Sequence, residues 1–147
     1  MEIIDIKKNL NYLKEYASLC YLEWSNKEKK LDEYVEYKIN KILNGNKEIS
    51  ILGLVDGKKL IGFISLFKYD GEERCDLCPW YATMYVKKEY RGNGYSKILN
   101  DAILKEAKSL GYKKVYLKSD LVNYYEKFGA IYMDKLNNGE NLYYIEL

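Results

Sequence analysis

The chain of 147 residues contains no histidine at all. Without histidine it cannot build a Ser-His-Asp or Cys-His nucleophile, and it cannot bind a metal through imidazole. Any general base must therefore be a carboxylate, a Lys, Cys or Tyr with a shifted pKa, or a water molecule held by one of these groups.

Cysteine is scarce as well, with only three residues. An odd, low count provides no disulfide framework. Cys75 and Cys78 have the spacing of a redox pair or of half a zinc site, but a zinc site needs two more soft ligands and only Cys20 remains. We interpret Cys75 and Cys78 as small apolar side chains at the start of a strand and expect no metal.

The sequence also lacks a large excess of charge and a long apolar run. The net charge of +2 does not favour a nucleic-acid partner. No apolar run is long enough to cross a membrane. The N-terminus, Met1–Asp5, does not have the layout of a signal peptide. We expect neither a nucleic-acid nor a membrane partner and a cytoplasmic location.

The residues that are present fit one globular domain over 1–147, with 48% hydrophobic and 31% charged residues. Apolar side chains recur at helical spacing from Leu10 to Trp24 and again from Leu31 to Ile42. Extended segments follow at Ile49–Val55, Leu60–Phe67 and Pro79–Val86. The first third is therefore predicted to be helical and the middle to form strands.

A glycine turn then leads into a helix that ends at Gly111 and a short strand, Val115–Leu117. A strand, helix and strand at this spacing predict a parallel pair with a right-handed crossover. A short helix is expected over Leu121–Phe128, before a hairpin of Ala130–Asp134 and Leu142–Ile145. The predicted class is α/β, with a central mixed, mostly antiparallel twisted sheet and helices on both faces.

The turn Arg91-Gly92-Asn93-Gly94-Tyr95-Ser96 is the most informative segment. The first turn of a helix leaves backbone N–H groups without partners, and the helix dipole adds positive potential there. Two glycines allow the backbone to approach a ligand closely. The segment is therefore expected to bind an anion such as a pyrophosphate.

Several motifs compete for this turn. A Walker A loop needs Gly-Lys-Ser/Thr, but Tyr95 follows Gly94. A dinucleotide fingerprint needs a third glycine where Lys97 stands. The pattern Arg/Gln-x-x-Gly-x-Gly/Ala matches except at Ser96. The remaining interpretation of this turn, taken alone, is a plain loop whose glycines allow a helix to begin.

The wider context separates these readings. The run Pro79–Gly94 closely resembles the acetyl-CoA-binding core of the GNAT (general control-related N-acetyltransferase) superfamily. A second block, Tyr124–Gly129, resembles the family's Tyr-Glu-Lys-x-Gly segment. The two blocks stand in the family's order, and the resemblance covers about the last two-thirds of the chain. It departs from the family at Ser96 and at Ala130, which replaces the usual aromatic residue and puts the acceptor pocket in question.

The resemblance implies how acetyl-CoA is held. The backbone of Met84, Tyr85 and Val86 would pair with the pantetheine arm, as a strand edge does with amides. Backbone amides of Arg91, Gly92, Asn93, Gly94, Tyr95 and Ser96 would hold the pyrophosphate, next to Lys97. The candidate charge partners for coenzyme A are Lys87, Lys88, Arg91, Lys97 and Lys127, with Arg91 foremost.

The resemblance also suggests catalytic roles. Tyr125 is the expected general acid for the departing thiolate. A free Tyr has a pKa near 10 and a thiol near 8.5, so this transfer is uphill by about 2 kcal/mol unless the site lowers the Tyr pKa. The general base is open: we name Asp76, with Glu72, Glu73 and Glu23 as further options.

The expected function is that of an N-acetyltransferase that moves the acetyl group of acetyl-CoA to a primary amine of a small molecule or peptide by direct attack. The first alternative is a non-catalytic acyl-CoA-binding or regulatory module on the same fold. The second is a nucleotide-binding enzyme that uses the glycine turn for ATP or NAD. A homodimer is compatible with the resemblance, and the acceptor amine is left open.

Overall fold

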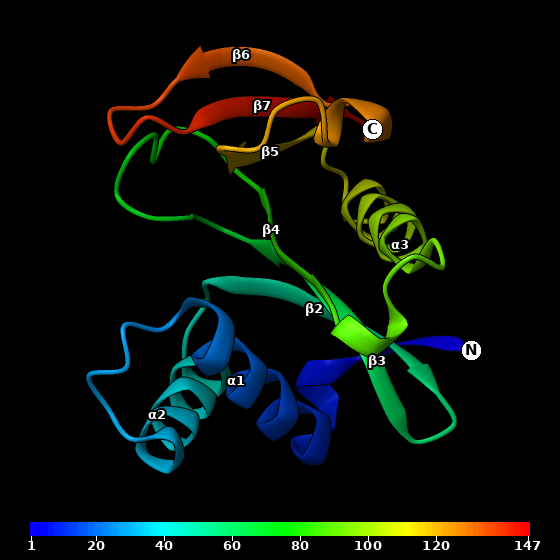
Figure 1. Cartoon of the computed structure of the whole chain (residues 1–147). Coiled ribbons are helices and arrows are strands. Elements are labelled where there is room, and N and C mark those ends of the chain that lie inside the picture. The colour runs from blue at the N-terminus through cyan, green and yellow to red at the C-terminus, as the bar shows by residue number, and fades with distance from the viewer.

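The computed structural model covers residues 1–147 and has one seven-stranded sheet in the order β1-β2-β3-β4-β5-β7-β6 (Figure 1). The strands are β1 (Glu2–Asp5), β2 (Glu48–Asp56), β3 (Lys59–Phe67), β4 (Trp80–Val86), β5 (Lys114–Ser119), β6 (Ile131–Lys135) and β7 (Asn141–Glu146). The α-helices are α1 (Leu10–Trp24), α2 (Leu31–Asn44) and α3 (Tyr95–Ser109). Short 3₁₀ helices are η1 (Ile6–Lys8), η2 (Lys88–Tyr90) and η3 (Tyr125–Phe128). No helix combines the length and the apolar character that a membrane span requires.

The observed elements confirm most of the expected order and the mixed sheet. All strand pairs are antiparallel except β4 and β5, which are parallel across the α3 crossover, as predicted. Besides the short helices η1 and η2, which were not expected, two elements differ from expectation. Strand β1 was missed, because four residues at the edge of a sheet carry almost no periodic signal. The helix expected over Leu121–Phe128 is only the 3₁₀ turn η3.

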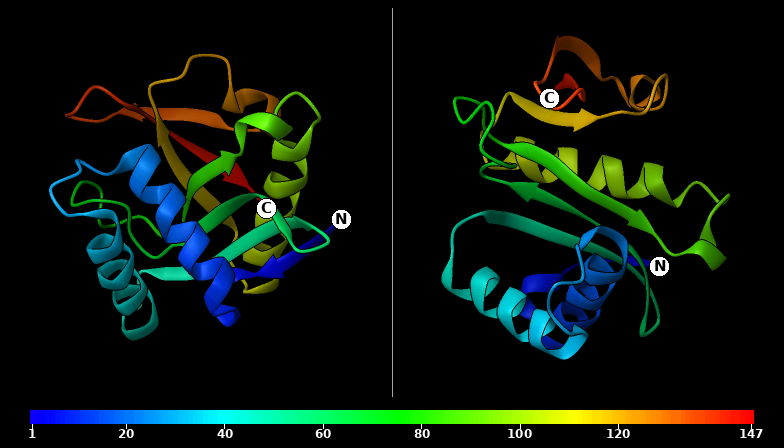
Figure 2. Two further views of the ribbon diagram at one scale, coloured as in Figure 1. Left: turned by 60° about the horizontal axis from the view of Figure 1, so that its bottom comes forward. Right: turned by 60° about the vertical axis from the view of Figure 1, so that its left-hand side comes forward.

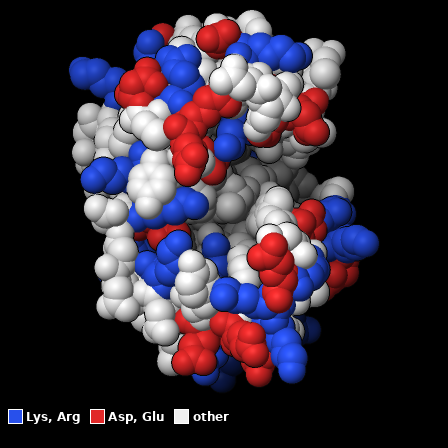
Figure 3. All heavy atoms as spheres, turned by 90° about the vertical axis from the view of Figure 1, so that its left-hand side faces the viewer, with Lys and Arg blue, Asp and Glu red and all other residues white.

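Strands β4 and β5 pair only at Trp80, the first residue of β4, which lies opposite Tyr116 in the middle of β5. Beyond this pair the two strands separate, and the edge of β4 that faces β5 has no partner strand along residues 81–86 (Figure 2). A hollow lies between the β5–β7 part and the α1–α2 part of the surface (Figure 3). The split therefore opens the middle of the sheet to a ligand.

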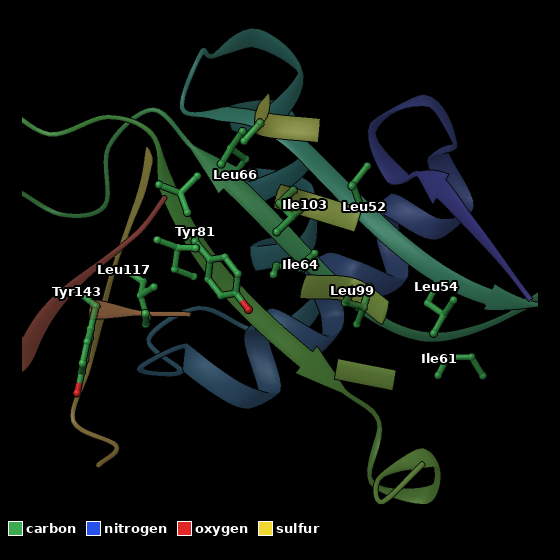
Figure 4. Packing of buried hydrophobic residues seen from close by; sticks show 14 residues of the cluster. Leu52, Leu54, Ile61, Ile64, Leu66, Tyr81, Leu99, Ile103, Leu117 and Tyr143 are labelled. Atoms are coloured by element: carbon green, nitrogen blue, oxygen red, sulfur yellow. The ribbon is translucent and has the colours of Figure 1, made fainter. Parts of the chain in front are cut away.

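The core has one layer on each face of the sheet. Strand β2 shows why: Leu52 and Leu54 pack into the α3 cluster, while Ile51 and Val55 pack into the α1–α2 cluster. Side chains alternate between faces along a strand, so a strand buried on both faces reads as a continuous apolar run. Figure 4 shows the α3 side, where Leu99 meets the buried residues of β2, β3 and β4. Helices therefore cover both faces of the sheet that contains β4, the strand that borders the split.

Candidate active site

The glycine turn has the backbone shape that an anion site requires. Gly92 and Gly94 have φ angles of 83° and 77°, and Gly94 stands at the N-cap of α3 without a side-chain cap. The N–H of Lys97 donates to the carbonyl of Gly94 at 3.2 Å, but the five N–H groups from Gly92 to Ser96 have no acceptor in the protein. Such consecutive free donors at a helix N-terminus suit a phosphate group.

Arg91 is the cation that lines the cavity beside this turn. Its Nε donates to the carbonyl of Val86 at 2.8 Å, and its guanidinium lies 5.6 Å from the centre of the Tyr85 ring. The three other nearby cations with contacts are already engaged: Lys87 with Glu15, Lys97 with Asp101 and Lys127 with the ring of Tyr124. Since a guanidinium has five donors, Arg91 keeps several for a ligand.

Strand β4 is bent where it passes the split. Its pairing with β3 shifts between Ala82 and Tyr85, which leaves Thr83 and Met84 in a bulge. Thr83 has a φ of 52°, a strained value for a β-branched residue. Its hydroxyl donates to Ser65 at 2.6 Å, and the buried Tyr16 hydroxyl lies 3.2 Å from the same oxygen. This polar network holds the bulge in place.

Two cavities lie in the split. The first, which we call the turn cavity, has a volume of about 390 Å³ and lies beside the glycine turn. The second, which we call the helix cavity, has a volume of about 510 Å³ and reaches toward α1 and α2. Both are lined by Glu23, Met84 and Tyr125. The three residues therefore mark the point where a ligand in one cavity meets a ligand in the other.

Tyr125 reaches this junction from η3. Its ring packs edge-on against Tyr81 at 6.0 Å and against Tyr124 at 4.8 Å between ring centres. Burial, and secondarily the neighbouring Tyr124, raise the pKa of Tyr125 above its usual value. The site therefore keeps the Tyr125 hydroxyl protonated rather than making it a stronger acid.

The junction carries a carboxylate, but it is not that of Asp76. The Asp76 side chain is 63% exposed, lines neither cavity and accepts two hydrogen bonds from Arg74, each 3.1 Å long. These bonds lower the pKa of Asp76, which makes it a weaker base. Glu23, at the end of α1, lines both cavities. Asp76 therefore lies away from both cavities, whereas Glu23, another carboxylate considered from the sequence, lines both.

Most of the other predicted residues come together. The turn cavity is lined by Met84, Tyr85, Val86, Arg91, Gly92, Tyr95, Ser96 and Tyr125. Asn93, Gly94 and Lys97 do not line it; Asn93 instead donates to the carbonyl of Tyr90 at 3.0 Å. Sequence reasoning missed Tyr90, Leu121 and Tyr124 as lining residues, although Tyr124 could have been suspected as the neighbour of Tyr125. Ala130 is buried in the α3 cluster and lines neither cavity.

The structure also bears on metal binding and on the three cysteines. No group of three or more Cys, Asp or Glu side chains is arranged to hold a metal ion. Cys75 and Cys78 are both free and exposed, whereas Cys20 is buried. Burial raises the pKa of the Cys20 thiol to about 11, although this residue lines the helix cavity. A thiol with so high a pKa stays protonated and is a poor nucleophile.

The sequence also matches the model of a known protein family. The model of the Acetyltransferase (GNAT) family matches residues 11–130. A search of curated proteins gave no match.

The fold is also found among solved structures. An aminoglycoside 6'-N-acetyltransferase complexed with coenzyme A has a TM-score of 0.76 at 21% identity, with 99% of this chain and 97% of that chain covered. The aminoglycoside 6'-N-acetyltransferase from Enterococcus faecium has a TM-score of 0.71 at 19% identity, with 99% and 97% covered. The PaiA N-acetyltransferase from Thermoplasma acidophilum in complex with coenzyme A has a TM-score of 0.66 at 21% identity, with 99% and 98% covered. At these identities the likeness establishes the shared fold.

Proposed function

Because the chain belongs to the Acetyltransferase (GNAT) family, we propose that it transfers the acetyl group of acetyl-CoA to a primary amine of a small molecule or peptide. The observation that carries this proposal is the meeting of two cavities at Glu23, Met84 and Tyr125. One cavity offers an anion site and the other a separate acceptor site, as a direct transfer between two bound reactants requires.

The residues of the turn cavity fit coenzyme A. The free N–H groups from Gly92 to Ser96 would hold the pyrophosphate, with Arg91 beside them. The unpaired edge of β4 at Met84–Val86 would pair with the amides of the pantetheine arm. When bound, acetyl-CoA supplies an activated thioester that a neutral amine can attack without a covalent enzyme intermediate.

Glu23 and Tyr125 would move protons at the junction. The Glu23 carboxylate would accept a proton from the acceptor ammonium, directly or through water, because only the neutral amine is a nucleophile. Tyr125 would donate to the sulfur that leaves. Its raised pKa keeps the hydroxyl protonated throughout the neutral range, so the donor is lost only as the pH rises through that raised pKa. The same shift makes full proton transfer to the thiolate more unfavourable than it is for a free Tyr.

Binding and turnover test the proposal separately. In a calorimetric titration acetyl-CoA should bind and ATP should not. In an amine panel, free-thiol release should report acetyl transfer. Binding of ATP in place of acetyl-CoA would refute the proposal in favour of a nucleotide-binding enzyme. Binding of acetyl-CoA with no thiol release by any amine would instead support a non-catalytic acyl-CoA-binding module.

A Tyr125→Phe variant tests the acid. Removing the donor should lower kcat about a hundredfold, because a positioned proton donor contributes at least this much. The Kd for acetyl-CoA should change less than twofold, because the ring and its packing remain. Tyr124→Phe is the matched control, since Tyr124 lines the turn cavity but not the junction. Unchanged turnover in Tyr125→Phe would remove the proposed acid.

A further inference from the structure

The helix cavity has a basic end. Next to α2 it adjoins a smaller cavity of about 180 Å³, and both are lined by Tyr34, Lys38 and Lys47. Lys41 also lines the smaller cavity. We call Lys38, Lys41 and Lys47 the lysine end. It stands apart from the junction, because none of the three lines the turn cavity.

The three ammonium groups of the lysine end have no anionic partner. None of them takes part in an ion pair, and neither Lys38 nor Lys47 donates a side-chain hydrogen bond to the protein. Hydrogen bonding to the Tyr37 hydroxyl raises the pKa of Lys41. Each lies over an aromatic ring instead: Lys38 is 5.9 Å from the Tyr34 centre, Lys41 5.3 Å from Tyr37 and Lys47 4.7 Å from Phe67. An aromatic face attracts the cation but accepts few of its three N–H bonds. The donors therefore remain available to an anion.

The carboxylates nearby do not neutralise this end. Glu48 is the only one that lines the smaller cavity, against three lysines. Asp70 and Glu140 also line the helix cavity, but neither lines the smaller one. Lys118 lies 3.9 Å from the Asp70 carboxylate, and Glu140 accepts a hydrogen bond from Asn138 at 2.7 Å. Glu23 stands at the other end, at the junction. The helix cavity is therefore negatively charged where it meets the turn cavity and positively charged where it reaches α2.

We propose that the acceptor amine carries an acidic group, carboxylate or phosphate, that binds at the lysine end. This inference rests on the proposed function and names the acceptor class. An ammonium beside Glu23 and an anion beside Lys38 and Lys47 match the charges of the cavity, so a zwitterion is favoured. A polycationic amine meets like charge at the lysine end and is disfavoured.

Matched acceptors test the charge preference. Ethanolamine is compared with O-phosphoethanolamine, and γ-aminobutyramide with γ-aminobutyrate; kanamycin is the polycation. Thiol release gives kcat/KM, and calorimetry on the protein with coenzyme A gives acceptor binding. The acidic member of at least one pair should be favoured about tenfold, as expected for a hydrogen bond to a charged group. The pair that shows the difference separates phosphate from carboxylate.

Lysine variants test where the acidic group of the acceptor binds. Lys38→Gln should raise the KM for the acidic acceptor about tenfold, while the KM for acetyl-CoA and for the neutral acceptor stays the same. Lys58→Gln, in the turn between β2 and β3, is the control and should change none of these values. If Lys38→Gln lowers the melting temperature, an unchanged KM for acetyl-CoA shows that the coenzyme site is still folded. The preference should also weaken as salt is added.

The outcomes of the two proposals are distinct. Equal use and equal binding of acidic and neutral acceptors, or a preference for kanamycin, overturns the acidic-acceptor inference. Preferential binding of the acidic members without thiol release would support an acidic-ligand site at the lysine end and refute the acetyl transfer on which the proposed function depends. An acidic preference that persists in Lys38→Gln, Lys41→Gln and Lys47→Gln alike overturns the assignment to the lysine end.

Discussion

The turn cavity and the helix cavity are built in different ways. The turn cavity is formed largely by one continuous stretch, residues 84–96, and most of its free donors are backbone N–H groups. The helix cavity is lined by side chains from α1, α2, β3, β4, β5 and the loops around them. Under the proposed function, the coenzyme would be held mainly by backbone groups, while the acceptor would meet side chains. Side chains of the helix cavity can therefore change while the coenzyme site stays the same.

Glu23→Gln should show the largest effect among the variants that separate the two cavities. It removes the carboxylate at the junction but keeps the shape of the side chain. We expect kcat/KM to fall about thirtyfold, less than for a fully buried base, because the exposed site lets bulk water accept part of the protons. The decrease should be smaller at high pH, where more of the amine is already neutral. Thiol-release kinetics from pH 6 to pH 9.5 measures this.

Asp76→Asn is the matched control for Glu23→Gln. The Asp76 carboxylate binds Arg74 at the surface and lines neither cavity, so the change should alter kcat/KM less than twofold. A large loss in Asp76→Asn together with normal turnover in Glu23→Gln would reverse the assignment of the base.

Gly94→Ala should have an intermediate effect, confined to the turn cavity. A Cβ at Gly94 meets no atom within 4 Å, so the difficulty is conformational, at a φ of 77°. An L-residue in this region is strained by about 1–2 kcal/mol. We expect the free turn to relax and the Kd for acetyl-CoA to rise about tenfold. Titration calorimetry measures the change.

Gly57→Ala is the control for this variant. Gly57 has a φ of 62° in the turn between β2 and β3 and equally open surroundings. It should lower the free energy of unfolding by a similar amount and leave the Kd unchanged. Equal Kd values for Gly94→Ala and the unmodified chain would show that the turn does not grip the coenzyme.

Much of the fold could be predicted from the sequence because its signals are local. Apolar residues at helical spacing mark α1 and α2, and continuous apolar runs mark β2 and β3. The parallel pairing of β4 with β5 followed from the crossover. Strand β1 could not be found in this way. It forms only because Ile3 and Ile4 lie opposite Leu54 and Gly53 in β2, a partner about fifty residues away.

The same distinction between local and long-range signals applies to the site. The glycine turn was recognisable because its φ values and free N–H groups depend on neighbouring residues. Asp76 was proposed because it lies just before β4 in sequence, yet Arg74 draws its carboxylate to the surface. Glu23 reaches the junction because α1 packs across β3, an arrangement that depends on tertiary packing. The lysine end joins α2 to the loop before β2 and was likewise invisible as a site.

The smallest effects are expected for Arg91 and Lys87, which can be compared directly because both are cations near the end of β4. Lys87 pairs with Glu15 of α1, so Lys87→Gln should lower the free energy of unfolding by at most about 1 kcal/mol and leave the Kd for acetyl-CoA unchanged. Arg91 has free donors in the turn cavity, so Arg91→Gln should raise that Kd about threefold, and the rise should shrink as salt is added. Titrations at two salt concentrations, with thermal unfolding of both variants, measure these effects. An equal rise in Kd for both variants would mean that net charge, rather than the placed guanidinium, attracts the coenzyme. No rise in either would leave the backbone donors as the whole of the anion site.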